Sequence, residues 1–167
     1  MINLKIKKLH PDVILPTKAH DTDACFDIYA DCTNDVYYEW TINKELNIPE
    51  FVWKDKGTKI DPGKAVTIHT GFSTEIPKGY FAAVFCRSGM GIKKHLRLSN
   101  SVGIIDSDYR GEWMVALHND GVEPQVINHG DRIAQFTLLP VLDVSIEEAE
   151  EISDTDRGEG GFGSSGR

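Results

Sequence analysis

The sequence predicts an all-β domain, built either as a β-sandwich or as a barrel. Two observations support this prediction. Apolar residues recur at every second position in several short runs, and glycine or proline separates these runs. Helix signals are thin: SGMGIKKH (88–95) offers a turn or two, and SIEEAEEI (145–152) suits a helix and a solvated acidic connector equally well.

The expected strands follow one another closely along the chain. Pro77-Lys78-Gly79 supplies a turn between two of them, and SDYRG (107–111) supplies another, which predicts a hairpin around it. The runs that we expect to be strands are INLKIKKL (2–9), AVTIHTGFSTEI (65–76), YFAAVF (80–85), LRLSNSVGIID (96–106), EWMVALHND (112–120), QVIN (125–128), RIAQFTLLPVL (132–142) and DVSI (143–146).

Residues 31–58 differ from the rest of the chain because they are rich in aromatic residues. A loop of this length without structure of its own is uncommon, so we expect a hairpin or a folded flap. We also expect its aromatic side chains to pack on the body of the domain rather than to form a binding surface. These aromatic residues are Tyr37, Tyr38, Trp40, Phe51 and Trp53.

Length and composition exclude several classes of protein. A chain of 167 residues suits one domain, and a net charge of −8 argues against direct binding to nucleic acid or to an anionic membrane. No apolar run approaches the roughly 20 residues of a membrane span, and the N-terminus is too polar for a signal peptide. The three cysteines lack the spacing of a disulfide framework, which fits a reducing compartment, and the six histidines lack zinc-ligand spacing. The cytoplasm is the expected location because no targeting signal is visible.

Residues that could carry chemistry concentrate in five short stretches at expected strand ends and turns. They are ACFDIYA (24–30), CRSGMG (86–91), NSVGIIDSDYRGE (100–112), HGDRIAQ (129–135) and RGEGGFGSSGR (157–167). Arg87, Ser88 and nearby glycine N–H groups suit an anion, although Arg-Ser-Gly also makes ordinary loops. The glycine-rich end of the chain offers similar donors, but its composition equally suits a disordered tail.

Acidic residues in these stretches suggest a second kind of chemistry. Asp27 interrupts an apolar run, where a carboxylate is costly unless it is paired or solvated. Asp106 and Asp108 lie near a turn, and a carboxylate there could orient and deprotonate a water molecule. Tyr109 beside them offers a flat face for a sugar or a base. The alternative interpretation of both stretches is an ordinary cap or polar turn.

The fourth stretch is ambiguous on its own. Arg132 could be an ion-pair partner of Asp131, and Gln135 could serve a ligand or a neighbouring strand. Taken together, the stretches place arginines 87, 110, 132 and 157 beside acids 27, 106 and 108, which suits a polyphosphate with a divalent cation. The residues themselves therefore indicate a phosphate-ester site in a β-rich protein.

The five stretches, in this order and spacing, resemble the five motifs of the trimeric dUTP pyrophosphatases (dUTPases). GIIDSDYRGE, GDRIAQ and RGEGGFGSSG are near-complete matches, and the resemblance covers the chain except residues 31–58. It implies a jelly-roll-like β-sandwich over residues 1–152 that forms a homotrimer, with active sites where subunits meet. It also implies a flexible, glycine-rich C-terminal arm at residues 153–167, which closes over the active site.

The resemblance implies a dUTP diphosphatase, which hydrolyses dUTP to dUMP and pyrophosphate, keeps uracil out of DNA and supplies dUMP for thymidylate synthesis. Asp106 would be the general base that activates water for attack on the α-phosphorus. Mg²⁺ would be held mainly by the triphosphate, with Asp27 near its water shell. The phosphate-binding residues would be Arg87, Ser88, Gly89, Gln135, Arg157, Ser164 and Ser165. The residues that bind uracil or deoxyribose would be Asn100, Gly103, Ile105, Tyr109 and Phe162.

The chain departs from the family pattern at several points: RSGMG replaces the commoner RSGLA, and compact members lack residues 31–58. Cys25 stands where the family usually has glycine, and Trp113 stands where a smaller residue is usual, which suggests an interface anchor. Three other functions are alternatives. The dCTP deaminases share the fold, but Ala116 occupies the position of their catalytic glutamate. The other two are a non-catalytic nucleotide-binding protein and a structural β-sandwich with a disordered tail. In addition to catalysis, residues 31–58 could bind a regulatory protein partner.

Overall fold

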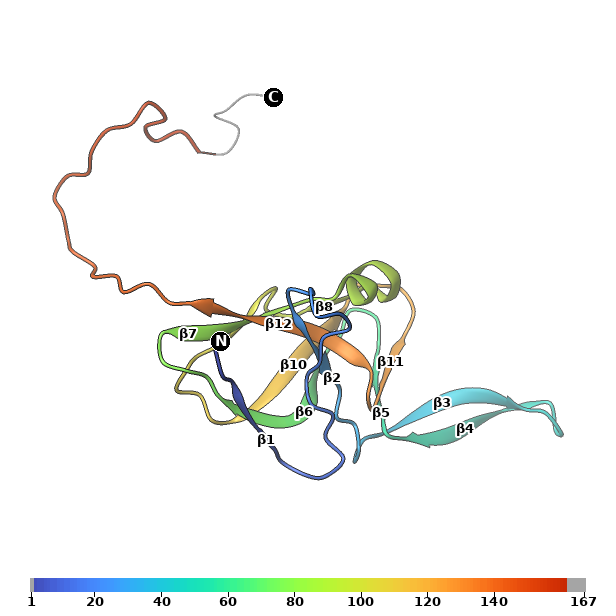
Figure 1. Cartoon of the computed structure of the whole chain (residues 1–167). Helices are drawn as coiled ribbons and strands as arrows, with labels where there is room; N and C mark the ends of the chain where they lie inside the picture. Colours follow the sequence, from blue (N-terminus) through green and yellow to red (C-terminus); the bar gives the residue numbers. More distant parts are fainter. Residues whose placement is uncertain (1, 162–167) are drawn as a thin grey trace.

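The prediction of an all-β domain is confirmed by the computed structural model, which describes residues 2–161 (Figure 1). Its one helix within these residues is the five-residue π-helix η1 (Gly89–Lys93), where the sequence predicts a turn or two. The strands are β1 (Lys5–Lys8), β2 (Phe26–Tyr29), β3 (Val36–Asn43), β4 (Ile48–Asp55), β5 (Gly57–Ile60), β6 (Ala65–Glu75), β7 (Tyr80–Phe85), β8 (Leu96–Leu98), β9 (Gly103–Ile105), β10 (Glu112–Asn119), β11 (Gln125–Asn128) and β12 (Arg132–Pro140).

Two antiparallel sheets of four strands form the body of the molecule. One has the order β1-β6-β10-β8 and the other the order β2-β12-β7-β9. The core lies between them, and its centre is Trp113 of β10, whose ring lies 5.3 Å from that of Phe72 and 5.0 Å from that of Phe136, measured between centroids. Phe72 belongs to the first sheet and Phe136 to the second, so Trp113 joins the two layers of a sandwich.

Trp113 is therefore not the interface anchor that the sequence suggests. Its side chain is 1% exposed in a single chain, and its Nε1 atom donates a hydrogen bond to Thr74 Oγ1 over 3.1 Å. The period-2 pattern of β10 already points this residue inward, because its neighbours Glu112 and Met114 face the other side of the strand.

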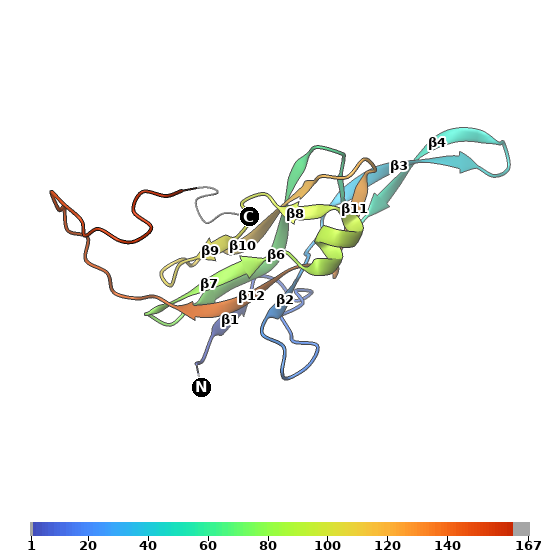
Figure 2. The same cartoon turned by 90° about the horizontal axis from the view of Figure 1, so that it is seen from above.

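The expected hairpin around SDYRG is absent from residues 2–161, because LRLSNSVGIID divides into two strands of different sheets. β8 pairs with β10, whereas β9 pairs with β7. Between them the chain turns at Asn100 and Ser101, and Ser101 has a positive φ of 62°, which breaks an extended strand. The segment from Asp106 to Gly111 therefore connects the two sheets, as Figure 2 shows at the end of the sandwich where β9 meets β10.

Residues 31–58 contain the β3–β4 hairpin, which confirms the prediction of a hairpin. Figures 1 and 2 both show it projecting from the body. Tyr37 agrees with the prediction of packing on the body, because it is half-buried and its ring fills the space beside Gly57 of β5. For three other aromatic residues this prediction is wrong. Tyr38 contacts Phe51 and Trp53 at centroid distances of 5.3 and 5.7 Å, yet these side chains are 47%, 53% and 69% exposed. They lie on one face of the hairpin because its register pairs Tyr38 with Trp53.

Residues 141–161 leave the sandwich without forming a strand or a helix. The prediction of a strand at DVSI is therefore wrong, and SIEEAEEI is a connector rather than a helix. Several apolar side chains of this segment are exposed, including Leu142 and Ile146 at 79% and 98%. Within residues 2–161, no helix is long and apolar enough to cross a membrane.

Candidate active site

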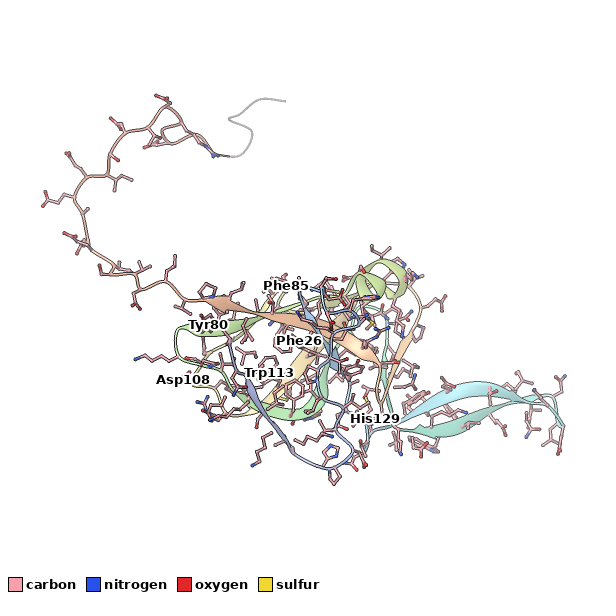
Figure 3. The ribbon with its side chains drawn as sticks, viewed as in Figure 1. Phe26, Tyr80, Phe85, Asp108, Trp113 and His129 are labelled. Atoms are coloured by element: carbon pink, nitrogen blue, oxygen red, sulfur yellow. The ribbon has the colours of Figure 1, made fainter. Side chains whose placement is uncertain are left out.

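Three adjacent strands bring three of the predicted site regions together. The register places Asp27 of β2 opposite Gln135 of β12, and Gln135 opposite Phe85 of β7. Arg87 follows Phe85 by two residues, so ACFDIYA, CRSGMG and HGDRIAQ meet on one sheet although they are far apart in sequence. The strands around Phe26 and Phe85 are visible in Figure 3.

Asp27 is the centre of this group. It is 9% exposed, and a buried carboxylate is stable only when it is paired or hydrogen-bonded. Arg87 Nε donates to its Oδ1 atom over 2.6 Å, and Arg132 Nη1 donates to its Oδ2 atom over 3.2 Å. Arg132 thus pairs with Asp27 and not with Asp131, the partner that the sequence suggests. One carboxylate holds two guanidinium groups side by side.

The segment after Arg87 opens towards solvent. The N–H groups of Met90 and Gly91 donate to the carbonyl of Arg87 over 3.0 Å each, which forms the start of η1. Ser88 is exposed and makes no capping hydrogen bond, and a Cβ atom on Gly89 would meet no heavy atom of residues 2–161 within 4 Å. Gln135 Nε2 donates to the carbonyl of Cys86 over 3.2 Å, so Gln135 adjoins the same segment.

The two cysteines near this group are poor nucleophiles. Burial raises the pKa of the Cys25 thiol and that of the Cys86 thiol, which keeps both neutral at physiological pH. Cys25 is not among the described non-glycine residues with positive φ, so cysteine fits the position where the family usually has glycine. The geometry around Asp27 is therefore compatible with this substitution.

A second group of predicted site residues lies along β9 and the segment after it. Gly103 is buried: a Cβ atom there would lie 3.1 Å from Val84 Cβ and 3.6 Å from Asn100 Nδ2, so glycine allows β9 to approach β7 closely. Asp106 is exposed. A hollow of about 210 Å³ beside it is lined by Ile104, Ile105, Asp106, Tyr109, Glu112 and Met114.

Glu112, which sequence reasoning did not single out, anchors this segment. Its carboxylate accepts hydrogen bonds from the N–H groups of Thr70 and Gly71 over 3.2 and 2.8 Å. His69 Nδ1 lies 2.9 Å from the same carboxylate, and this hydrogen bond raises the pKa of His69. The Tyr109 hydroxyl donates to the Glu112 carbonyl over 3.0 Å. No sequence signal marks Glu112, because its role depends on the pairing of β10 with β6.

Arg110 has a local role in the described chain. Its Nη1 atom donates to the carbonyls of Ser107 and Tyr109 over 2.7 and 3.0 Å. These two hydrogen bonds brace the turn that carries Asp106 and Asp108. Arg110 is thus placed with the turn, and not with Arg87 and Arg132 around Asp27.

The two groups lie at opposite ends of β7. Ile105 pairs with Ala82, so Asp106 lies beyond the start of this pairing, whereas Arg87 follows the end of β7. Asp106 lies at the level of Phe81, and the strand from there to Phe85 spans about 13 Å at roughly 3.3 Å per residue, with Arg87 two residues further along the chain. Figure 3 agrees: Asp108 lies towards the Tyr80 end of β7 and Phe85 marks the other end. One chain therefore does not bring Asp106 to Arg87.

The C-terminal segment lies apart from both groups in Figure 1. Arg157 Nε donates to the carbonyl of Gly160 over 2.9 Å, which makes a local turn. Phe162, Ser164 and Ser165 lie outside the described residues. Within residues 2–161, no group of three or more histidine, cysteine or acidic side chains is arranged to hold a metal ion.

The fold and these groups define a β-sandwich protein in which two arginines pair with one buried carboxylate on the second sheet. The sequence model of the dUTPase family matches residues 54–166, and the chain belongs to the dUTPase family. This membership confirms the resemblance seen in the sequence, and it confirms the prediction that the protein is an enzyme, a dUTPase.

Relatives extend the comparison to the rest of the chain. A deoxyuridine 5'-triphosphate nucleotidohydrolase of Clostridioides difficile is 38% identical over 166 residues, which are 99% of each chain. One of Desulfitobacterium hafniense is 50% identical over 113 residues, which are 67% of this chain and 75% of the relative. A solved mutant dUTPase of Staphylococcus bacteriophage 80alpha with dUpNHpp has a TM-score of 0.78 at 25% identity, covering 99% of each chain. The predicted dUTPase-type sandwich is thereby confirmed.

Proposed function

We propose that this protein is a dUTP diphosphatase, which hydrolyses dUTP to dUMP and pyrophosphate. The observation that carries the proposal, beside family membership, is the meeting of Asp27, Arg87 and Gln135 across β2, β12 and β7. A cluster of guanidinium, amide and backbone N–H donors at one sheet surface is suited to a triphosphate. In the cell this reaction would keep uracil out of DNA and supply dUMP for thymidylate synthesis, and the cytoplasm remains the predicted location.

Asp106 is the general base in this proposal. Its exposed carboxylate is free to accept a proton from a water molecule. The water oxygen then forms a bond to the α-phosphorus, the bond from that phosphorus to the bridging oxygen breaks, and pyrophosphate leaves with the electron pair. The neutral thiols of Cys25 and Cys86 favour water over a cysteine nucleophile.

The phosphate chain of dUTP binds at the other group of residues, which surrounds Asp27. Arg87, the Ser88 hydroxyl and the N–H group of Gly89 donate to phosphate oxygens at the open start of η1, and Gln135 lies beside them. Arg157, Ser164 and Ser165 add donors from the arm, and arm closure excludes water from the reacting phosphorus. These donors stabilise the charge that builds up on the leaving pyrophosphate.

The described residues fit a Mg²⁺ ion that the substrate itself holds. The only acid in the arginine group is Asp27, and Mg²⁺ commonly binds through one or two carboxylates plus substrate phosphates. Each Asp27 oxygen accepts one of these arginine hydrogen bonds and keeps a lone pair that can accept another from a metal-bound water. The ion would neutralise phosphate charge and orient the chain of phosphates.

The β9 segment binds the uracil and the deoxyribose of dUTP in this proposal. Uracil presents an N3–H donor between two carbonyl acceptors, and the Asn100 side chain or the backbone of residues 100–109 can match this pattern, whereas cytosine would leave buried groups unpaired. Gly103 and Ile105 line the close approach of β9 to β7. Tyr109 contacts the deoxyribose in this proposal, where a 2′-hydroxyl would clash, and Phe162 stacks on the base.

The separation along β7 supports a homotrimer with sites between subunits. Asp106 and Arg87 lie beyond opposite ends of a stretch of β7 that alone spans about 13 Å, so one chain does not place both residues at the same phosphate group. A neighbouring copy can bring its own β9 segment to this chain's arginines. Closed symmetric assemblies are the usual form of soluble oligomers, and the resemblance to the trimeric dUTPases supports three copies in this one.

The experiment that tests this function is pyrophosphate release with Mg²⁺ from dUTP, dCTP, dTTP and UTP, with Asp106→Asn as the control. We expect release from dUTP alone and its loss in the variant. Tight dUTP binding without release by the unaltered protein would instead indicate a non-catalytic binding protein. Release from dUTP by Asp106→Asn at the normal rate would exclude Asp106 as the base.

We also propose that the β3–β4 hairpin binds a regulatory protein partner. Its exposed face carries Tyr38, Phe51 and Trp53, and an apolar surface of this kind marks an interaction site. The register pairs Val36 with Asp55, so a short Gly-Ser linker can replace residues 36–55. The shortened protein should keep dUTP turnover and lose a partner that the full chain captures. Equal capture by both chains would exclude the hairpin as the binding surface.

A further inference from the structure

The β12 strand contains a bulge beside the proposed phosphate site. Gln135 lies opposite Asp27 and Ala134 opposite Ile28, but Arg132, not Ile133, lies opposite Tyr29. One extra residue is therefore inserted in β12, and Ile133 and Ala134 are both fully buried although they are consecutive. Side chains alternate along a regular strand, so without the bulge Arg132 would face away from Asp27. The bulge turns Arg132 to the face that carries Asp27 and Gln135.

On this face Arg132 and Arg87 share one carboxylate. Besides their hydrogen bonds to Asp27, the Arg87 Nη1 atom donates to the Arg132 carbonyl over 3.4 Å. Two guanidinium groups and one carboxylate leave one net positive charge, in a chain whose overall charge is −8. Like charges repel when they are neighbours, so Asp27 is what allows the two arginines to lie together.

Arg132 has donors left for a ligand. Its side chain is 47% exposed, against 24% for Arg87. Within residues 2–161, Nη1 is the one guanidinium nitrogen of Arg132 with a hydrogen bond, and a guanidinium has five N–H donors. Arg87 already gives the buried Asp27 carboxylate a charged partner, so the pairing of Asp27 alone gives a weak reason for a bulge that presents a second, half-exposed arginine.

We propose that Arg132 is a second phosphate-binding arginine of the dUTP site, and that the bulge in β12 serves to present it beside Arg87. This inference rests on the proposed function. A triphosphate carries several negative charges, and a second guanidinium adds charge-assisted hydrogen bonds to them. Asp27 is then a positioning residue, because it holds both arginines in place before the substrate binds.

The test compares Arg132→Gln with Arg132→Lys and with Arg97→Gln. Arg97 is the matched control because its side chain is also 47% exposed and pairs with an acid, Asp120, at 2.8 Å. We expect Arg132→Gln to raise KM for dUTP and Kd for dUpNHpp about 10-fold or more, the usual effect of a lost charged hydrogen bond. The KM and Kd of Arg132→Lys should lie between those of the unaltered protein and those of Arg132→Gln. The salt dependence of dUpNHpp binding should weaken in Arg132→Gln but not in Arg97→Gln.

A background change separates direct binding from an effect through Asp27. In an Asp27→Asn protein, Arg132→Gln should still weaken dUpNHpp binding if Arg132 contacts phosphate. If the effect of Arg132→Gln vanishes in that background, Arg132 acts only by holding Asp27 and the inference is overturned.

Three outcomes keep the inference separate from the proposed function. Failure of the unaltered protein to hydrolyse dUTP contradicts the proposed function, and the inference falls with it. Normal hydrolysis together with unchanged Kd in Arg132→Gln contradicts the inference alone. If Arg132→Gln fails to fold, Arg132→Lys decides: a point charge replaces a planar donor, so an unchanged Kd and KM would overturn the inference.

Discussion

Gly111 determines where the ring of Tyr109 can lie. A Cβ atom on Gly111 would come within 2.6 Å of Tyr109 Cζ, so the ring occupies space that any other residue at 111 would fill. The Tyr109 hydroxyl is fixed by the Glu112 carbonyl. The orientation of the one aromatic side chain in this turn therefore depends on its glycine.

Sugar discrimination should depend on this orientation. Tyr109→Ala removes the ring and Gly111→Ala displaces it, so both variants should accept more UTP. We expect the ratio of kcat/KM for dUTP to that for UTP to fall about tenfold in each, as expected when a contact of 1–2 kcal/mol is lost. Steady-state kinetics with both nucleotides measure this ratio. An unchanged ratio in Tyr109→Ala would contradict the role of Tyr109 at the sugar.

The His69–Glu112 pair should make stability depend on pH. Hydrogen bonding to Glu112 raises the pKa of His69 above its usual 6.5, so the folded state holds the proton more tightly than the unfolded state. The stabilisation of the folded state by this pair is therefore complete below pH 6.5, and it is lost as the pH rises through the pKa of His69 in the folded state. Because the His69 side chain is 54% exposed, we expect the pair to contribute well under about 1 kcal/mol to the free energy of unfolding.

Urea unfolding of the unaltered protein and of His69→Asn between pH 5.5 and about 8.5 measures this contribution. The difference in free energy of unfolding between the two proteins should shrink as pH rises. A difference that grows with pH, or that stays constant, would show that His69 is not stabilised in its protonated form.

Among single residues, the sequence indicates candidate site residues by their chemical type. A carboxylate that interrupts an apolar run marks Asp27, and the hydroxyl and glycines that follow mark Arg87. The sequence suggests the wrong partner for Arg132 and gives no signal for Glu112. Both failures have the same cause. Their contacts depend on strand register and on a bulge, and neither is encoded in the neighbouring residues.

Two tryptophans show how differently the elements contribute to stability. Trp113 of β10 is 1% exposed between the sheets, whereas Trp53 of β4 is 69% exposed on the hairpin. We expect Trp113→Ala to lower the free energy of unfolding by about 3–5 kcal/mol, and Trp53→Ala by less than about 1 kcal/mol. Urea unfolding of both variants gives the comparison. Equal losses would mean that the Trp53 side chain is buried in the assembled protein.

Alternation and turn residues predict most strands of the sandwich correctly. The errors share a physical cause. LRLSNSVGIID has continuous strand character, yet Ser101 adopts a left-handed conformation and divides it between two sheets. DVSI alternates like a strand but finds no partner within residues 2–161, and a strand exists only when a neighbour accepts its hydrogen bonds.

At the scale of the whole molecule, mixed assemblies can test the proposal that each site is shared between two chains. Asp106→Asn and Arg87→Gln should each abolish most activity alone. If the two residues of one site come from different chains, unfolding and refolding the two inactive proteins together should restore part of the activity, because some sites then receive both normal residues. Pyrophosphate release measures the recovery. No recovery, with mixed trimers demonstrated by mass, would place both residues of a site on one chain.

The distance between Asp106 and Arg87 along β7 also has a genetic consequence. Under the shared-site arrangement, a cell that makes normal and altered chains mixes them within each trimer. A chain altered only at Asp106 disables the single site to which it would give the base, so activity falls in proportion to its share of the pool. A chain altered at both residues disables two sites, and activity falls with the square of the normal share. The doubly altered allele would therefore be the more dominant of the two.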